Sequence, residues 1–312
     1  MQNRSPLGLI LTLLLLLFCD GAGHAARITD YLVIRQPVSD QAGRELLAIR
    51  SFNSDGMARL LVVDPATLLS YDLPACSTSL RVESDDPAVA PTPLARALQR
   101  YNSAPYRLQN GGAIRAETEV DGFFLTVDLC PSKRPFERGM FDAAGALGKG
   151  FPVPVAVAVS GLWLESHPEE VSYLKGEIAA GRLAVTWVNH SRNHHYDSKA
   201  PLERNFLLAP GTDHLNEMIE LEQQLLALGL VPSPFFRFPG LVSDPAILTS
   251  LRELSLIPIG SDAWLAKGET PRPGSFILVH GNGNEPKGVS LLMPILKEKD
   301  LRLLPLPAAF GS

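Results

Sequence analysis

The chain of 312 residues has little charge of either sign in excess. Its 28 Lys and Arg residues against 33 Asp and Glu residues give a formal net charge of −5, and no basic run stands out. Such a balance offers no electrostatic footprint for nucleic acid or for anionic lipid. We therefore expect no nucleic acid among its partners. With 46% apolar and 20% charged residues, the composition is that of a soluble globular protein with one large core and room for a small extra module.

Long hydrophobic runs are scarce, and the most pronounced one lies at the N-terminus. Arg4 precedes the apolar segment Leu7–Phe18, and small residues follow at 21–26. A run of about 12 residues is too short for a spanning helix, which needs roughly 20. The order basic, apolar, small is typical of a secretory signal peptide. We expect residues 1–26 to be cleaved rather than kept as an anchor. The protein would then be exported, periplasmic or secreted, with no stable membrane span.

Cysteine is also scarce, with three in the chain. One of them, Cys19, would leave with the signal peptide. Cys76 and Cys130 would then reach an oxidising compartment, where pairing is permitted. One disulfide between them and two unpaired thiols are both compatible with the sequence.

Residues 27–115 read as a small α+β module. Tyr31–Arg35, Leu46–Phe52 and Leu60–Asp64 have the composition of short strands, and the last two are joined by turn residues at 53–56. Thr92 is a suitable N-cap, and Pro93 a suitable first residue, for a helix ending near Tyr101. No catalytic constellation is recognisable in this part of the chain.

Residues 116–312 alternate apolar runs with amphipathic segments. Several runs are continuously apolar, as strands covered on both faces should be, and Pro168–Ala180 and Leu215–Leu228 have helical spacing. Strand, helix, strand in series predicts a parallel sheet with right-handed crossovers. Seven strands favour a β/α barrel, with a doubly wound open sheet as the alternative. The runs are Phe123–Asp128, Val153–Ser160, Leu183–Asn189, Phe235–Phe238, Leu256–Ser261, Phe276–His280 and Leu301–Leu304.

Reactive side chains stand at the ends of five of these runs. They are Asp128, His190, Arg237, Asp262 and His280. The carboxyl ends of barrel strands meet at one rim, where β/α-barrel enzymes carry their active sites. We therefore predict that these side chains, together with His194, cluster around one cleft at that rim.

The segment after the third run contains two imidazoles four residues apart, His190 and His194. One helical turn or a tight loop can aim both at one cation. His195 and Asp197 directly afterwards are further possible ligands. The alternative reading of this segment is a solvated polar loop.

Five motifs, taken in order, resemble the polysaccharide deacetylase family, also called the NodB-homology or carbohydrate esterase family 4 group. Residues 126–132, Thr-Val-Asp-Leu-Cys-Pro-Ser, resemble its T-F-D-D-G-P-S motif, and residues 190–194 match H-S-x-x-H. Arg237–Gly240, Asp262–Trp264 and Leu278–His280 are similar to the third, fourth and last motifs. The resemblance covers residues 120–305 approximately. It implies a distorted NodB-like (β/α)7 barrel, preceded here by the small α+β module.

The resemblance also implies a metal-assisted amide hydrolysis. His190 and His194 would hold a divalent metal, commonly zinc, that polarises the acetamide carbonyl and a water. Asp128 would be the general base for that water. Arg237 would pair with Asp128 and keep it ionised.

The remaining motif residues would protonate the leaving group and shape the pocket. His280 would protonate the amine, oriented by a contact with Asp262. The backbone N–H of Gly240 would help to hold the oxyanion. Trp264 and Leu278 would wall the slot for the acetyl methyl group.

One position departs from the family pattern. Leu129 stands where the family has a second aspartate, the third metal ligand, and a leucine cannot coordinate a cation. Asp128 itself, or one of Asp197, Asp213 and His195, is a candidate replacement, and the Cys130 thiolate is a further one. Unless one of these replaces it, the metal should be weakly bound or absent. If the protein is a weak metal enzyme, restoring the carboxylate by Leu129→Asp is expected to tighten metal binding and to raise deacetylation.

These observations predict an exported hydrolase that removes N-acetyl groups from an amino-sugar polysaccharide. Because of Leu129, the alternative is a catalytically impaired relative that binds a polysaccharide. Hydrolysis of another carbon–nitrogen bond on the same fold is a third possibility.

Overall fold

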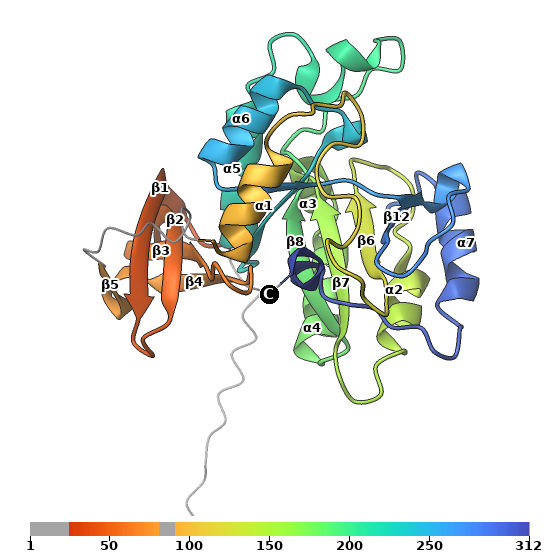
Figure 1. Cartoon of the computed structure of the whole chain (residues 1–312), viewed down its shortest axis with the longest axis horizontal. Helices are drawn as coiled ribbons and strands as arrows, with labels where there is room; N and C mark the ends of the chain where they lie inside the picture. Colours follow the sequence, from red (N-terminus) through yellow and green to blue (C-terminus); the bar gives the residue numbers. More distant parts are fainter. Residues whose placement is uncertain (1–24, 81–90, 312) are drawn as a thin grey trace, which may run out of the picture.

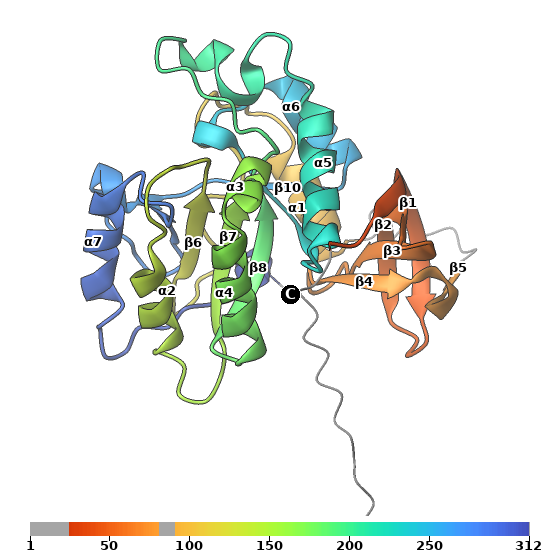
Figure 2. The ribbon, with the colours of Figure 1, turned by 180° about the vertical axis from the view of Figure 1, so that it is seen from behind.

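The computed structural model describes residues 25–80 and 91–311, so the predicted signal peptide lies almost wholly outside the described residues. These residues form two separate sheets, one antiparallel and one parallel. The antiparallel sheet lies beside the parallel one, with helices α1 (Pro93–Tyr101) and α5 (His214–Ala227) between them (Figures 1 and 2). Within the described residues, no helix is long and apolar enough to cross a membrane.

The small antiparallel sheet confirms the three strands expected near the N-terminus and adds two. Its strand order is β4-β3-β2-β1-β5. Asp55 and Gly56 form the β2–β3 turn with positive φ angles of 50° and 82°, the combination that a tight two-residue hairpin turn requires. Thr92 caps α1 as expected, since its side chain accepts a hydrogen bond from the Ala95 amide. The strands are Ile28–Asp40, Glu45–Ser54, Met57–Val63, Ser70–Pro74 and Thr78–Leu80.

The larger sheet is parallel throughout and curled, which confirms the predicted α/β fold class. Its order is β10-β9-β8-β7-β6-β12-β11. The edge strands β10 and β11 are consecutive in sequence, and residues 260–262 link them, so the sheet curls until its two edges are joined by that link. The strands are β6 Phe124–Leu129, β7 Val153–Val159, β8 Leu183–Asn189, β9 Pro232–Arg237, β10 Ile257–Ile259, β11 Ala263–Trp264 and β12 Phe276–His280.

The seventh strand is not the one that the apolar pattern predicted. Leu301–Leu304 makes one isolated parallel bridge, from Leu303 to Phe123. Both edges of β6 are already paired with β7 and β12, so this segment cannot pair with β6 itself. It pairs only with Phe123, the residue before β6. Ala263–Trp264 pairs with β12 instead.

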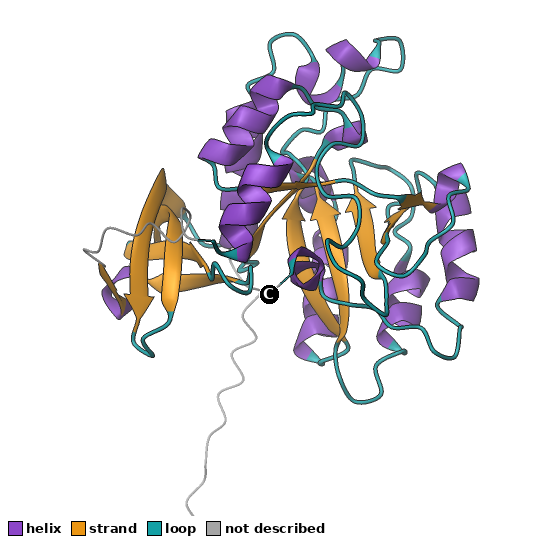
Figure 3. Cartoon of the chain, in the orientation of Figure 1, coloured by secondary structure: helices purple, strands orange, loops and turns teal. Residues whose placement is uncertain are grey.

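Helices cover the convex side of the curled sheet, as the alternating pattern predicts (Figure 3). The two helices anticipated from the sequence are α4 and α5. Odd-numbered residues of β6, including Leu125 and Val127, share an apolar cluster with Met140 and Phe141 of α2. The helices of this part are α2 Arg138–Gly145, α3 Gly161–Ser166, α4 Pro168–Ala179, α5, α6 Pro245–Glu253 and α7 Pro286–Ile295.

The concave side of the sheet changes character from one end to the other. Near the amino ends of the strands it is filled by aromatic rings. Phe310 stacks on Phe235 at 5.1 Å between ring centroids, and Phe124 meets Phe276 edge-on at 5.3 Å. Further along β6 the inward positions become Thr126 and then Asp128. The apolar floor therefore leaves room for a polar site only at the carboxyl ends.

A buried ion pair joins the small sheet to helix α5. Arg50 of β2 is fully buried, and its Nε and Nη2 lie 2.7 and 2.9 Å from the two carboxylate oxygens of Glu222 on α5. Tyr31 of β1 donates to the same carboxylate at 2.7 Å. Both oxygens of this carboxylate thus accept hydrogen bonds from residues of the small sheet.

The two cysteines of the described chain do not form the disulfide left open by the sequence. Cys76 is exposed, Cys130 is buried, and both are free thiols.

Candidate active site

A cleft of about 840 Å³ opens at the carboxyl ends of the parallel strands. Seven of the nine predicted site residues line it. Arg237 lies beneath its floor, fully buried, and Asp262 is elsewhere. The predicted residues that line the cleft are Asp128, His190, His194, Gly240, Trp264, Leu278 and His280.

The expected contact between Asp128 and Arg237 is present. Arg237 Nη1 lies 3.2 Å from Asp128 Oδ1, while its Nη2 donates to Thr126 Oγ1 at 2.9 Å and to the Gly260 carbonyl at 3.2 Å. Burial alone would raise the pKa of Asp128, but the Arg237 guanidinium together with the neighbouring imidazoles outweighs burial, and the pKa is lowered. Asp128 is therefore held as a carboxylate, with Oδ2 left to face the cleft.

His190 is fixed in one tautomer by the backbone beside it. Its Nδ1 lies 2.8 Å from the Arg237 carbonyl oxygen, which can only accept, so Nδ1 carries the proton. Nε2 then presents a lone pair to the cleft, 3.8 Å from Asp128 Oδ2. Burial disfavours the imidazolium and lowers the pKa of His190 from 6.5 to about 4. A neutral imidazole with an outer hydrogen bond is the form that ligates metals.

The loop that carries both histidines is held in an uncommon backbone conformation. Ser191 and His194 have φ angles of 64° and 48°, a left-handed region that non-glycine residues seldom adopt. The His194 amide donates to Ser191 Oγ at 3.2 Å, and Asn193 donates twice to the Glu217 carboxylate, at 2.7 and 2.6 Å. Since Glu217 belongs to α5, that helix fixes the loop. Residues held in such backbone conformations cluster at functional sites.

Cys130 completes a compact group with the two histidines. Its Sγ lies 3.5 Å from His190 Nε2, and one ligand atom from each of Cys130, His190 and His194 lies within 4.8 Å of the others. The two imidazole rings meet edge-on at 4.7 Å. Burial raises the pKa of the Cys130 thiol, but His194 and His280 outweigh it and bring the pKa to about 7.

The other replacement ligands considered from the sequence have different roles or positions. Asp213 is the N-cap of α5 and accepts from the Asn216 amide. Asp197 is exposed and accepts from the Lys199 amide at 2.8 Å. His195 is exposed as well. Over residues 25–80 and 91–311, the group that meets the spacing for a metal is Cys130, His190 and His194.

Leu129 has its side chain on the opposite face of β6 from Asp128. Successive side chains of a strand alternate between faces, and Leu129 is fully buried in the apolar cluster between the sheet and the helices. The position that corresponds to the family's second aspartate therefore does not face the cleft in this chain.

The expected contact between Asp262 and His280 is wrong. Asp262 Oδ1 accepts from the amide of Phe276, the first residue of β12, and its Oδ2 lies 3.9 and 3.8 Å from Arg115 and Arg272. His280 is the last residue of β12, about 13 Å further along the strand. The prediction failed because Asp262 follows β10 but also directly precedes β11, whose first residue, Ala263, pairs with Ile277 near the start of β12.

Glu285 occupies the place expected for Asp262. Its Oε2 lies 2.8 Å from His280 Nδ1 and accepts from Trp264 Nε1 at 2.7 Å. Burial alone would lower the pKa of His280, but Cys130 and Glu285 reverse the effect, so the pKa lies well above its usual value. Glu285 stands five residues after the last motif, and no strand end or motif marks it in the sequence.

Three residues shape the walls of the cleft. Trp264 and Leu278 are neighbours across the β11–β12 pair and both line it. Gly240 has a φ of 61°, and a Cβ there would lie 2.3 Å from the Phe206 ring. Glycine is thus required for the backbone to pass this close to Phe206 at the edge of the cleft.

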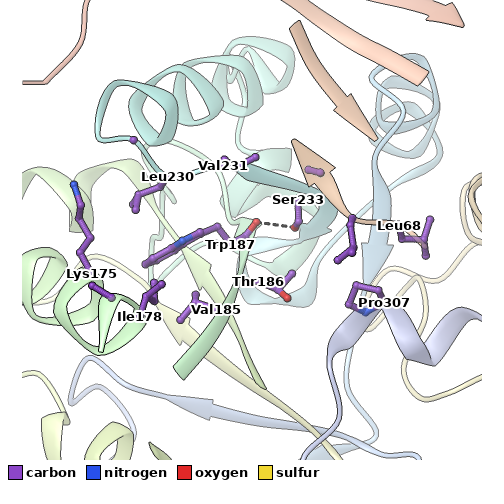
Figure 4. A pocket seen from close by; sticks show the side chains of 14 residues that line it. Leu68, Lys175, Ile178, Val185, Thr186, Trp187, Leu230, Val231, Ser233 and Pro307 are labelled. Carbon is purple, nitrogen blue, oxygen red and sulfur yellow. Dashed lines mark hydrogen bonds between the residues drawn. The ribbon is translucent and has the colours of Figure 1, made fainter. Parts of the chain in front are cut away.

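A second cavity, of about 400 Å³, lies between the small sheet and the amino-terminal half of the parallel sheet (Figure 4). Two of its polar groups are already paired. Ser233 Oγ donates to the Trp187 carbonyl at 2.6 Å (dashed in Figure 4), and Lys175 Nζ donates to the Leu228 carbonyl at 2.9 Å. Its lining has no carboxylate, imidazole or thiol, so this cavity offers neither an acid–base pair nor metal ligands.

Comparisons with known proteins give matches to both parts. A family model described as the RP012 protein N-terminal domain matches residues 29–81, the region of the antiparallel sheet. The structure is similar to a family 4 carbohydrate esterase from Bacillus anthracis (18% identity, 71% of this chain, 93% of that chain, TM-score 0.48). It is also similar to a chitin deacetylase from Colletotrichum lindemuthianum (16% identity, 64% of this chain, 91% of that chain, TM-score 0.45). A family 4 pseudoenzyme from Bacillus anthracis is similar as well (13% identity, 64% of this chain, 68% of that chain, TM-score 0.44). At these identities, no activity is carried over to this chain.

Proposed function

We propose that this protein is an exported hydrolase that removes N-acetyl groups from an amino-sugar glycan. The observation that carries the proposal is the pairing of two opposite acid–base groups in one cleft. Asp128 is held ionised by Arg237, and His280 is held protonated beside Glu285. Amide hydrolysis needs both, because a water must lose a proton and the departing amine must gain one. The resemblance of the five sequence motifs to those of polysaccharide deacetylases supports an acetamide as the substrate.

Each of the cleft residues has its own role in the proposed hydrolysis. Asp128 Oδ2, the oxygen away from Arg237 Nη1, accepts a proton from the water that attacks the acetyl carbon. His280 donates its proton to the amine nitrogen as the carbon–nitrogen bond breaks. Acetate and the free amine are the products. Glu285 keeps the imidazole aimed and charged for this transfer, while Trp264 and Leu278 enclose the acetyl methyl group.

The cleft also fits a divalent cation, with zinc as our proposal. His190 presents an unprotonated Nε2, and the buried Nε2 of His194 has no hydrogen-bond partner. An orphaned buried nitrogen is costly unless a ligand satisfies it. A cation held there would polarise the acetyl carbonyl and the attacking water.

The experiment is acetate release from chito-oligosaccharides by the zinc-loaded protein. His280→Ala should reduce turnover by about 10²–10⁴-fold. Asp262→Asn is the matched control, since its carboxylate lies at the other end of β12 and an amide oxygen can still accept from Phe276. Turnover close to wild type in that variant is expected. Equal losses in both variants, or no acetate from the wild type, would refute the proposal.

The alternative, a glycan-binding relative without activity, is favoured by one observation. Leu129 faces the apolar cluster, so the cleft lacks the carboxylate that the family uses as a ligand. Retained binding of chito-oligosaccharides together with no acetate release, at full zinc occupancy, would select this alternative.

A further inference from the structure

We propose that Cys130 supplies the third, anionic ligand of the cation, so that this cleft holds a thiolate-ligated metal. The inference builds on the metal-assisted part of the proposed function, but it concerns binding and is tested without turnover. It assigns a ligand role to a buried thiol that transfers no proton in either acid–base step.

The distances suit one ion shared between the three side chains. Sulfur at about 2.3 Å and nitrogen at about 2.1 Å from a tetrahedral zinc ion lie about 3.6 Å from each other. Cys130 Sγ and His190 Nε2 are 3.5 Å apart. His194 brings its ligand nitrogen within 4.8 Å of both atoms, and its loop is held by α5 through Glu217.

The lone pairs are available without rearrangement. His190 uses Nδ1 for the Arg237 carbonyl and leaves Nε2 free of a proton. His194 Nε2 is buried and unpartnered, and Cys130 is only 6% exposed. A hydrogen bond from a neutral thiol to His190 would satisfy one of these nitrogens and leave the other unpaired. A cation satisfies both.

The position of Cys130 explains how the site can dispense with the missing aspartate. Asp128 and Cys130 are two residues apart and both line the cleft, whereas Leu129 between them faces the apolar cluster. A thiolate contributes the negative charge that two neutral imidazoles lack against a dication. Asp128 carries charge as well, but Arg237 already balances it.

The donor set predicts which metal is preferred. Thiolate and imidazole together favour zinc, or cobalt as its spectroscopic substitute, over magnesium, calcium and manganese, which prefer oxygen ligands. This chain should therefore bind zinc selectively.

The test uses the full chain in a Cys76→Ser background, which removes the exposed thiol. Titration with Co²⁺ should give one equivalent bound and a thiolate-to-cobalt charge-transfer band in the near ultraviolet. Cys130→Ala should abolish the band and weaken zinc binding by more than about 100-fold, beyond the usual effect of removing an outer partner of a ligand. Cys130→Asp should keep tight zinc binding without the band. Bound zinc should also slow alkylation of Cys130.

Several results would overturn the inference. They are one equivalent of Co²⁺ bound without the band, undiminished zinc affinity in Cys130→Ala, or alkylation of Cys130 at the same rate with and without zinc. The last result in an active, chelator-insensitive protein would indicate a cysteine nucleophile instead. If zinc binds through Cys130 but no acetate is released, the ligand assignment holds and the proposed deacetylase function fails.

Discussion

Replacing Leu129 by aspartate should damage the fold rather than rebuild the metal site, contrary to the expectation from the motif alone. Leu129 is fully buried in the cluster between the parallel sheet and the helices. Losing such a leucine costs about 2–5 kcal/mol, and an unpaired carboxylate in its place adds a penalty or takes up a proton. We expect a loss of at least about 4 kcal/mol, a large share of the 5–15 kcal/mol typical of a domain.

Urea unfolding of the chelator-treated protein measures this loss, and zinc titration of the same samples measures affinity. Leu129→Met is the matched control, because a swap that conserves volume should cost less than about 1.5 kcal/mol. Leu129→Asp should give no gain in zinc affinity, whereas Cys130→Asp should retain it. A stable Leu129→Asp protein that binds zinc more tightly than wild type would contradict this argument. It would show that the side chain at position 129 of β6 can face the cleft instead of the apolar cluster.

Two predictions concern protonation. Because the fold lowers the pKa of His190 from 6.5 to about 4, the unfolded chain binds the extra proton between these values. The free energy of unfolding of the metal-free protein should therefore fall by about 3 kcal/mol from pH 6.5 to pH 4, measured by urea titration. Removing the carboxylate by Glu285→Gln should lower the pKa of His280, so the alkaline limb of the pH–rate profile should move to lower pH. An unmoved limb would remove Glu285 from the site.

The sequence predicts the larger part of the fold because burial on both faces leaves a clear pattern. Continuous apolar runs mark β6, β7, β8 and β12 closely, and helical spacing marks α4 and α5. The prediction fails where the pairing of strands, rather than their hydrophobicity, determines which segments join the sheet. Leu301–Leu304 is apolar enough for a strand but has no free edge to join, whereas the two residues of β11 are too short a run to recognise.

The candidate site is predictable to the extent that strand ends determine it. Asp128, His190 and Arg237 follow from that rule, and the contact between Asp128 and Arg237 is present. Glu285 lies beyond a strand end, and only the tertiary structure brings it to His280. Asp262 shows the opposite error, because a residue between two consecutive strands belongs to the end of one and the start of the next.

The Arg50–Glu222 pair limits how the chain can be shortened or recombined. A chain begun after the small sheet would leave the Glu222 carboxylate in the interior with neither its guanidinium nor the Tyr31 hydroxyl. Stranding a buried charge in this way typically costs 3–5 kcal/mol. The small sheet, residues 28–80, is thus not a separable module. A minimal catalytic fragment, or a chimera with another N-terminal module, would first need Glu222 replaced by an apolar residue of similar size.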